Sequence, residues 1–223
     1  HEIRTPLTLI KGPLENIILK KQVDAETRED LNVMKQNTER LLNLTNQLLD
    51  FRKTESQGFR LNFAKCNITE VLKETHVRFT SLAKQKGLDF TLQVPEKDFY
   101  AHVNQEAFTK IISNLLNNGM KYAESYVHVM LEAPQRDDNN LFRIRTVNDG
   151  VIIPDAMKEE IFKPFVRFNE QEDGKVTTGT GIGLALSRSL AEFHLGTLVM
   201  EAGEESNIFC LTLPVVQDTT ITL

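Results

Sequence analysis

The stretch NLLNNGMKY, Asn114 to Tyr122, decides the fold that we expect for this chain, and it lies in a predicted helix over residues 105–122. Asn114, Asn118 and Lys121 stand at i, i+4 and i+7, with Tyr122 next to the last of them. At about 100° per residue these four side chains share one face, while Phe108 and other apolar residues cover much of the rest. Two carboxamides, an ammonium and a phenol on an otherwise apolar helix indicate a polar ligand, although a solvated stripe would show the same spacing.

Three downstream segments favour the ligand over the stripe. The segment GTGIGL (179–184) opens a helix predicted to run to about residue 194, and glycines at alternate positions let backbone N–H groups approach an anion at a helix N-terminus. It is neither the dinucleotide pattern, because Leu184 replaces the last glycine, nor a P-loop. The segment FKPF (162–165) puts two aromatics in a loop, and VNDG (147–150) follows a strand. Together with the helix, these segments predict a nucleotide site.

The elements around these segments predict an α+β fold. Asn67 is a suitable N-cap with Glu70 three residues on, and Gly87 is suited to end that helix. Alternating apolar residues predict strands, and a short helical piece is expected near residues 157–162. The predicted strands are 59–63, 88–94, 127–131, 141–147, 198–201 and 208–213. Because strands and helices interleave with antiparallel hairpins, we expect an α+β sandwich.

Residues 1–56 show a different pattern. Apolar residues recur at alternating spacings of three and four, from Ile3 to Ile17 and again from Leu31 to Leu48, which predicts two helices packed side by side. Such a hairpin leaves much of its apolar surface exposed, so a dimer that forms a four-helix bundle is expected. The hairpin opens with HEIRTPL (1–7), where a titratable imidazole stands beside a carboxylate and one helical turn before a hydroxyl.

Composition excludes several classes. The 223 residues include 26 Lys plus Arg against 31 Asp plus Glu, a net charge of −5 that argues against nucleic-acid binding. Cys66 and Cys210 lie far apart without metal-ligand spacing, which favours two inert thiols in a reducing compartment. No apolar run approaches the ~20 residues of a membrane helix, and no signal peptide is visible.

The chain resembles the catalytic core of the sensor histidine kinases of two-component signalling, hybrid sensor kinases included. The resemblance rests on four motifs in order: HEIRTP (1–6) as the H box, residues 114–122 as the N box, 162–165 as the F box and 179–184 as the second glycine box. It implies a dimerisation and phosphotransfer hairpin over 1–56, cut at its start, an ATP-binding domain of the histidine kinase, gyrase and Hsp90 type over 57–217, and a tail over 218–223.

The resemblance also implies roles for particular residues. His1 would attack the γ-phosphate of ATP, Glu2 would bond the other ring nitrogen, and Thr5 would orient water when the partner is dephosphorylated. Asn114 and Asn118 would hold Mg²⁺ and phosphate oxygens. Lys121 would neutralise phosphate charge, and Tyr122 would flank the nucleotide. The remaining residues expected to bind ATP, or ADP as product, are Asn148, Gly150, Phe162, Phe165, Gly179, Thr180, Gly181, Gly183 and Leu184.

The first glycine box departs from the family pattern. Asn148 stands where an adenine-reading Asp is expected, and Ile152 stands in place of a glycine. A carboxamide oxygen can still accept from the adenine amine and its NH₂ can donate to N1, so we expect weakened but surviving ATP binding. Gly119 stands where the family more often has Ala.

The leading hypothesis is an autokinase that phosphorylates His1 and passes the group to an aspartate of a response-regulator receiver domain. We expect a homodimer, in the cytoplasmic portion of a membrane-anchored bacterial sensor. A nucleotide-binding scaffold or phosphatase with weak kinase activity is the alternative. A gyrase- or chaperone-like ATPase is disfavoured, because those enzymes use a Glu base where Asn114 stands and lack the phosphoacceptor hairpin.

Overall fold

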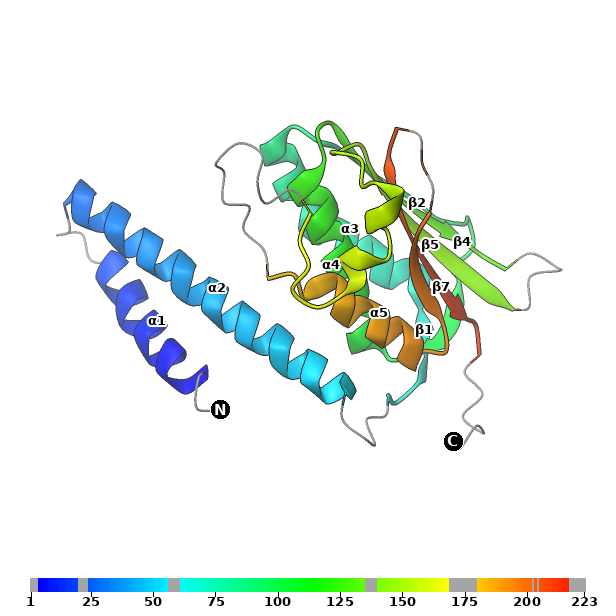
Figure 1. Ribbon diagram of the computed structural model, residues 1–223, viewed down its shortest axis with the longest axis horizontal. Helices are drawn as coiled ribbons and strands as arrows, with labels where there is room; N and C mark the ends of the chain where they lie inside the picture. Colours follow the sequence, from blue (N-terminus) through cyan, green and yellow to red (C-terminus); the bar gives the residue numbers. More distant parts are fainter. Residues whose placement is uncertain are drawn as a thin grey trace. The chain divides into compact units, whose positions relative to one another are not determined.

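The chain forms two compact units, residues 1–55 and 56–223, in a computed structural model (Figure 1). The structure describes residues 4–19, 24–55, 61–134, 140–168, 180–201, 203 and 205–216. Across these ranges the first unit is helical and the second combines strands with helices, which confirms the predicted helical hairpin followed by an α/β sandwich. None of the helices in these ranges has the length and apolar character needed to cross a membrane.

The first unit is a hairpin of α1 (Arg4–Ile18) and α2 (Ala25–Glu55) (Figure 1). Asp24 precedes α2 and caps it, because its carboxylate accepts the Thr27 N–H at 2.8 Å. Lys11 of α1 pairs with Glu39 of α2 at 3.0 Å. Exposed ion pairs stabilise little, so buried contacts must hold most of the hairpin together.

The positions that recur at spacings of three and four along α1 and α2 form a seam between the helices. This seam is only partly covered within one chain. Leu14 and Thr38 are buried. Other seam residues remain exposed, namely Ile10, Ile17, Met34 and Leu41. A two-helix unit with this much open apolar surface is stabilised when further helices pack on it.

The second unit is built on a five-stranded sheet in the order β2-β4-β5-β7-β6. The strands are β2 (Asp89–Gln93), β4 (Tyr126–Glu132), β5 (Leu141–Asn148), β7 (Asn207–Pro214) and β6 (Thr197–Glu201). The pairs β4–β5, β5–β7 and β6–β7 are antiparallel, whereas β2 and β4 are parallel. The parallel pairing of β2 with β4 was not predicted from the sequence. It arises because the connection between them, through α4, returns the chain in the same direction.

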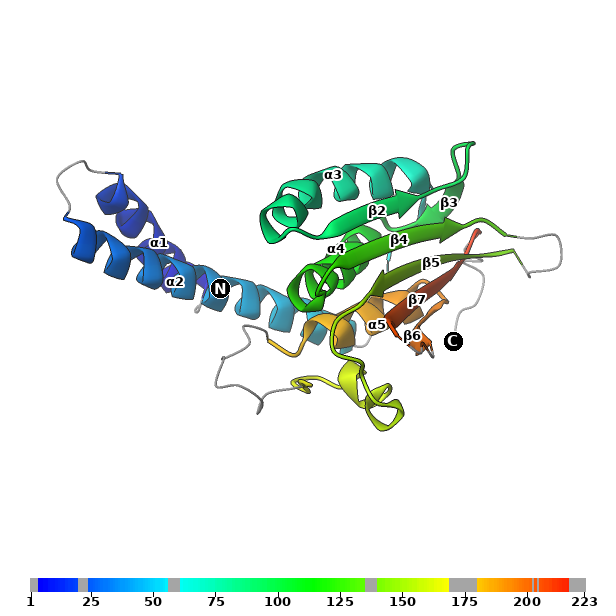
Figure 2. The same cartoon turned by 90° about the horizontal axis from the view of Figure 1, so that it is seen from above.

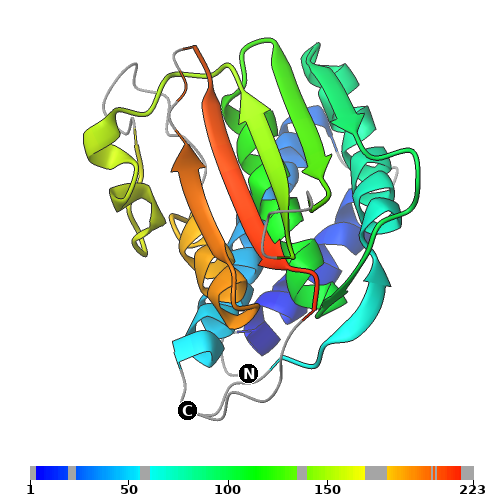
Figure 3. The ribbon, with the colours of Figure 1, turned by 90° about the vertical axis from the view of Figure 1, so that its right-hand side faces the viewer.

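Three helices lie on one face of this sheet: α3 (Ile68–Lys86), α4 (Gln105–Tyr122) and α5 (Gly183–Phe193) (Figures 2 and 3). The core forms between them, because every second residue of β4 and β5 is buried, among them Val127, Val129, Phe142 and Ile144. One-sided covering of this kind explains why the alternating pattern was readable in the sequence.

The predicted strand over 59–63 was wrong where the structure describes it, because residues 61–63 have no regular structure. The strand is β1 (Ala64–Asn67), which pairs antiparallel with β3 (Tyr100–Val103). Strand β3 was not predicted from the sequence. Its four residues alternate exposed and buried positions, a pattern too short to stand out.

The caps of the helices explain where they begin and end. The Asn67 side chain accepts the Glu70 N–H at 3.1 Å, and Gly87 ends α3 at φ 71°, so both predicted caps are confirmed. Asn104 caps α4 by accepting the Ala107 N–H at 2.9 Å. The helix predicted from residue 181 begins at Gly183, after a turn in which Gly181 has a φ of 69°.

Gly119, in the middle of α4, has a packing explanation. It is buried, and a Cβ at this position would lie 3.0 Å from a methyl group of Val127 on β4. Helix and sheet approach closely here, which offsets the intrinsic cost of a glycine inside a helix.

His194 is fully buried at the C-terminal end of α5. Its Nδ1 donates to the Leu190 carbonyl at 2.7 Å, and its Nε2 accepts the Asn104 N–H at 3.1 Å. The imidazole therefore joins the end of α5 to the start of α4 in its neutral form. Burial lowers the pKa of His194 and outweighs the hydrogen bonds that act in the opposite direction.

Candidate functional site: a nucleotide site beside helix α4

The polar face of α4 meets the start of α5. Asn114 is partly buried, and its Nδ2 donates to the Gly183 carbonyl at 3.3 Å and to the Ser187 hydroxyl at 3.1 Å. A Cβ on Gly183 would lie 3.8 Å from the Asn114 carboxamide. The structure thus brings together the asparagine helix and the glycine segment that the sequence analysis assigned to one site.

The first turn of α5 has no side-chain cap. Ile182 occupies the N-cap position of α5 without a side-chain cap, and Thr180 accepts the Ile182 N–H at 3.3 Å. An uncapped first turn keeps N–H groups available for an anion. Leu184 lies in this first turn, while the predicted site residue Gly179 lies outside the described residues.

The FKPF segment divides into a buried and an exposed half. Phe162 is buried against Phe209, with ring centroids 6.3 Å apart. Phe165 is 64% exposed at φ 66°, and its N–H donates to the Gly181 carbonyl at 2.9 Å. A Cβ on Gly181 would come within 2.8 Å of the Phe165 backbone, so only glycine allows this close approach. The backbone of Phe165 therefore lies against the glycine turn.

Arg188 on α5, which the sequence analysis did not single out, supports the same segment. Its guanidinium lies over the Phe162 ring at 3.7 Å and binds Glu159 at 2.7 Å. Its Nε donates to the Leu198 carbonyl at 3.1 Å. Cation–π and ion-pair contacts of one side chain thus join α5 to the short 3₁₀ turn Glu160–Phe162, which follows another such turn at Asp155–Met157.

Asn148 and Gly150 lie at the end of β5, close to the C-terminus of α4. A Cβ on Gly150 would lie 1.9 Å from the Tyr122 carbonyl oxygen, so glycine is required where the loop crosses the helix end. Asn148 is 4% exposed, and its Nδ2 has no hydrogen-bond partner. A buried amide without a hydrogen-bond partner is uncommon in folded proteins, so this group is a candidate for binding a ligand.

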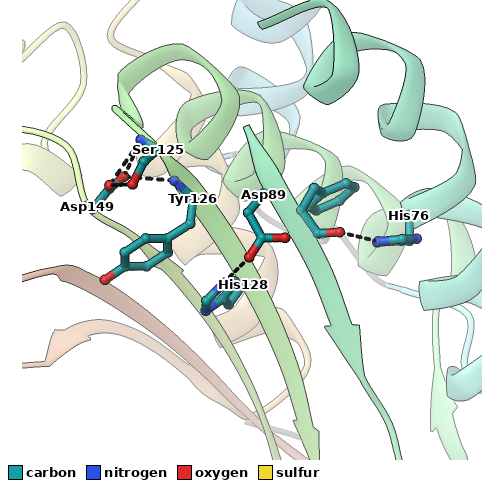
Figure 4. Close-up of polar contacts among 7 residues, drawn as sticks. His76, Asp89, Ser125, Tyr126, His128 and Asp149 are labelled. Atoms are coloured by element: carbon teal, nitrogen blue, oxygen red, sulfur yellow. Dashed lines mark hydrogen bonds and ion pairs between the residues drawn. The ribbon is translucent and has the colours of Figure 1, made fainter. Parts of the chain in front are cut away.

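Asp149, between these two residues, has a structural role. Its carboxylate accepts the N–H groups of Glu124, Ser125 and Tyr126 at 3.0–3.1 Å, and the Ser125 hydroxyl (Figure 4). Burial alone would raise the pKa of Asp149, but these hydrogen bonds outweigh it and hold the pKa well below its usual range. Asp149 therefore fixes the turn between α4 and β4. On the neighbouring strands β2 and β4, Figure 4 also shows Asp89 beside His128.

Asn207 on β7 holds the loop after β5. Its Oδ1 accepts the Ile153 N–H at 3.0 Å, and its Nδ2 donates to the carbonyls of Val151 at 3.0 Å and Gly150 at 3.3 Å. It is 3% exposed. No local pattern in the sequence pointed to this role, because Asn207 lies about 55 residues from the loop that it binds.

Ile152 has no strained backbone in this loop. The non-glycine residues with positive φ among the described residues are Asn140, Phe165 and Leu195. The loop therefore has a backbone conformation at Ile152 without the positive φ that a glycine would allow. The hydrogen bonds of Asn207 hold the loop in this conformation.

The other predicted residues are placed as follows. Asn118 is partly buried on α4, and Lys121 donates to the Tyr122 hydroxyl at 2.6 Å while lying over its ring at 4.3 Å. His1 and Glu2 lie outside the described residues. Thr5 lies in α1, but its side chain is not among the described ones.

Comparison with known families agrees with this architecture. Residues 103–217 match the model of the histidine kinase-, DNA gyrase B- and HSP90-like ATPase domain, and residues 1–57 match the His Kinase A (phospho-acceptor) domain. The chain belongs to the histidine kinase family.

The chain is similar to named kinases over most of its length. It is 32% identical to Histidine kinase P4 of Formosa agariphila over 96% of this chain and 16% of that protein. It is 27% identical to sensor histidine kinase WalK of Bacillus subtilis over 96% of this chain and 35% of that protein. It thus spans a minor part of these relatives.

Solved structures share the fold. Full-length ShkA in complex with AMPPNP matches with a TM-score of 0.79 at 22% identity, over 96% of this chain and 44% of that chain. Histidine kinase ThkA in complex with response regulator protein TrrA matches with a TM-score of 0.70 at 23% identity, over 98% of this chain and 60% of that chain.

Proposed function

We propose that this chain is the catalytic core of an ATP-dependent histidine autokinase that phosphorylates His1 and transfers the group to an aspartate of a response regulator. The observation that carries the proposal is the combination of two matched domains in one chain, a phospho-acceptor domain and a histidine kinase-like ATPase domain. We assign residues 1–56 to the first, 57–217 to the second and 218–223 to a tail.

In the proposed reaction a ring nitrogen of His1 attacks the γ-phosphorus of ATP. The N–P bond forms as the bond to the β-phosphate oxygen breaks, and ADP leaves. Glu2 accepts a hydrogen bond from the other ring nitrogen and stabilises the positive charge that develops on the imidazole. Thr5, four residues after His1 in the sequence, would orient the water that hydrolyses the phosphoryl group of the partner when the partner is dephosphorylated.

The nucleotide would bind between α4 and the start of α5. Backbone N–H groups of the turn at Gly181 and Gly183 suit the phosphates, and Lys121 adds positive charge. Because the Nδ2 of Asn114 donates to Ser187 and Gly183, its Oδ1 is the atom suited to Mg²⁺, together with Asn118. Carboxamide oxygens are ligands that fit this ion, which when bound would neutralise phosphate charge.

The proposal includes a homodimer and a receiver-domain partner. The exposed seam on α1 and α2 supports dimerisation. The fold likeness to ThkA, whose structure contains the response regulator TrrA, supports the partner. Membrane anchoring of the whole sensor stays a prediction.

Incubation with γ-labelled ATP and Mg²⁺ tests the proposal. We expect label that is stable to base, labile to acid and absent after His1→Gln. A purified receiver domain from the same signalling system should then take the label from the protein. Label that persists in His1→Gln would contradict the assignment of the phosphoacceptor.

A nucleotide-binding scaffold or phosphatase is the second candidate, favoured by the replacement of the expected Asp and Gly at Asn148 and Ile152. It predicts ADP binding and dephosphorylation of a phosphorylated receiver without labelling of His1. The same labelling experiment separates the two candidates.

A further inference from the structure

Two polar residues next to Asn148, Asn207 and Asp149, are engaged in other hydrogen bonds. Asn148 faces Asn207 across the β5–β7 ladder, but Asn207 directs its amide to Gly150, Val151 and Ile153. The adjacent Asp149 accepts N–H groups from the turn after α4. Within the described part of the chain, the Nδ2 of Asn148 is therefore buried with nothing to donate to.

A second polar atom on the same face of β5 is in the same state. Thr146 stands two residues before Asn148, is 1% exposed, and its Oγ1 has no hydrogen-bond partner. Successive residues of a strand alternate between faces, so Thr146 and Asn148 both lie on the side covered by the helices. An amide and a hydroxyl side by side, both unpartnered and both able to donate or accept, suit a ligand with a mixed polar edge.

The chemistry of the amide decides which ligand. A carboxylate only accepts hydrogen bonds, so at this position it would select the adenine N6 amine and repel the guanine O6. A carboxamide has an accepting end and a donating end. In one orientation its oxygen accepts from the N6 amine of adenine and its NH₂ donates to N1. After rotation by 180°, its NH₂ donates to O6 of guanine and its oxygen accepts from N1–H.

Free rotation requires that the protein hold neither orientation. Because the Nδ2 of Asn148 has no partner, turning the amide breaks no hydrogen bond of this group. By contrast, the amide of Asn207 is fixed by an N–H donor on one side and two carbonyl acceptors on the other. The two asparagines that face each other thus differ in whether the fold sets their orientation.

We propose that Asn148 makes this nucleotide site accept guanine as well as adenine nucleotides, with the carboxamide rotating to match the base. The inference rests on the proposed function, in which Asn148 contacts the base. Purine selectivity would then be low in this chain and recoverable by restoring a carboxylate.

The test is calorimetric titration of the whole chain with ADP and with GDP in the presence of Mg²⁺. We expect the two dissociation constants to differ by less than about tenfold. In Asn148→Asp the preference for ADP over GDP should increase by about tenfold or more, since a matched bidentate pair contributes roughly 5- to 150-fold to base discrimination. Gln105→Glu, which adds the same charge at an exposed position at the start of α4, outside residues 114–122, is the control and should leave the ratio unchanged.

The titration distinguishes failure of this inference from failure of the proposed nucleotide site. If the chain binds ADP and rejects GDP by more than about tenfold, the inference is overturned while the proposed nucleotide site stands. If neither nucleotide binds at millimolar concentration, the proposed function loses its nucleotide site as well. The wild-type ratio decides the matter even if Asn148→Asp fails to fold, and labelling of His1 by γ-labelled GTP is a second readout.

Discussion

Removal of the Asn207 side chain is the sharpest test of how the nucleotide loop is held. Asn207→Ala deletes three hydrogen bonds to the loop after β5: one from Ile153 N–H, and one each to the carbonyls of Gly150 and Val151. Each such bond contributes about 0.5–1.5 kcal/mol net. Because two of the three are only partly buried, we expect a loss of about 2 kcal/mol, which is a fall in Tm of roughly 4–8 °C for a domain of this size.

The loss should appear in nucleotide affinity as well as in stability. The loop carries Gly150 against the end of α4, so freeing it adds an ordering cost to binding, and we expect ADP to bind about tenfold more weakly. Titration calorimetry with ADP and a thermal melt of the same sample measure the two effects.

Asn104→Ala is the matched control. Asn104 is a partly buried asparagine whose Oδ1 accepts the Ala107 N–H at 2.9 Å and whose Nδ2 donates to the Asn62 carbonyl at 3.0 Å. It caps the N-terminus of α4, at the opposite end from Tyr122. It should lower Tm by a similar amount and leave ADP affinity unchanged. Equal ADP affinities for the wild type and Asn207→Ala, with a fall in Tm, would refute the reasoning.

Two further predictions concern single contacts. In Gly150→Ala the new methyl group would meet the Tyr122 carbonyl oxygen, so we expect a loss of about 1–3 kcal/mol in urea unfolding and weaker ADP binding; unchanged stability would show that the loop can shift freely. Because the pKa of His194 is lowered from 6.5 in the folded protein, the unfolded chain binds more protons, and stability should fall as the pH drops below about 6.5. Urea unfolding at pH 8 and 5.5 measures this, and His194→Asn should remove that part of the pH dependence.

The local signals in the sequence predicted most of the elements. Caps such as Asn67 and Gly87 depend on residues within one turn, so they were readable and are confirmed. The alternation along β4 and β5 was readable because only one face of the sheet is covered. The strand β3 and the parallel pairing of β2 with β4 were not, because pairing partners depend on contacts between distant segments.

The sequence by itself determined the chemistry of the candidate site: which helix carries the carboxamides, which segment carries the glycines, and that an amide, Asn148, stands at the end of a strand. Only the tertiary structure decided how these residues are used. It engaged Asp149 in a turn, turned Asn207 toward the loop, and left Asn148 buried without a partner. The physical reason is that residue type sets what a side chain can donate or accept, whereas its partners are set by packing between segments far apart in the chain.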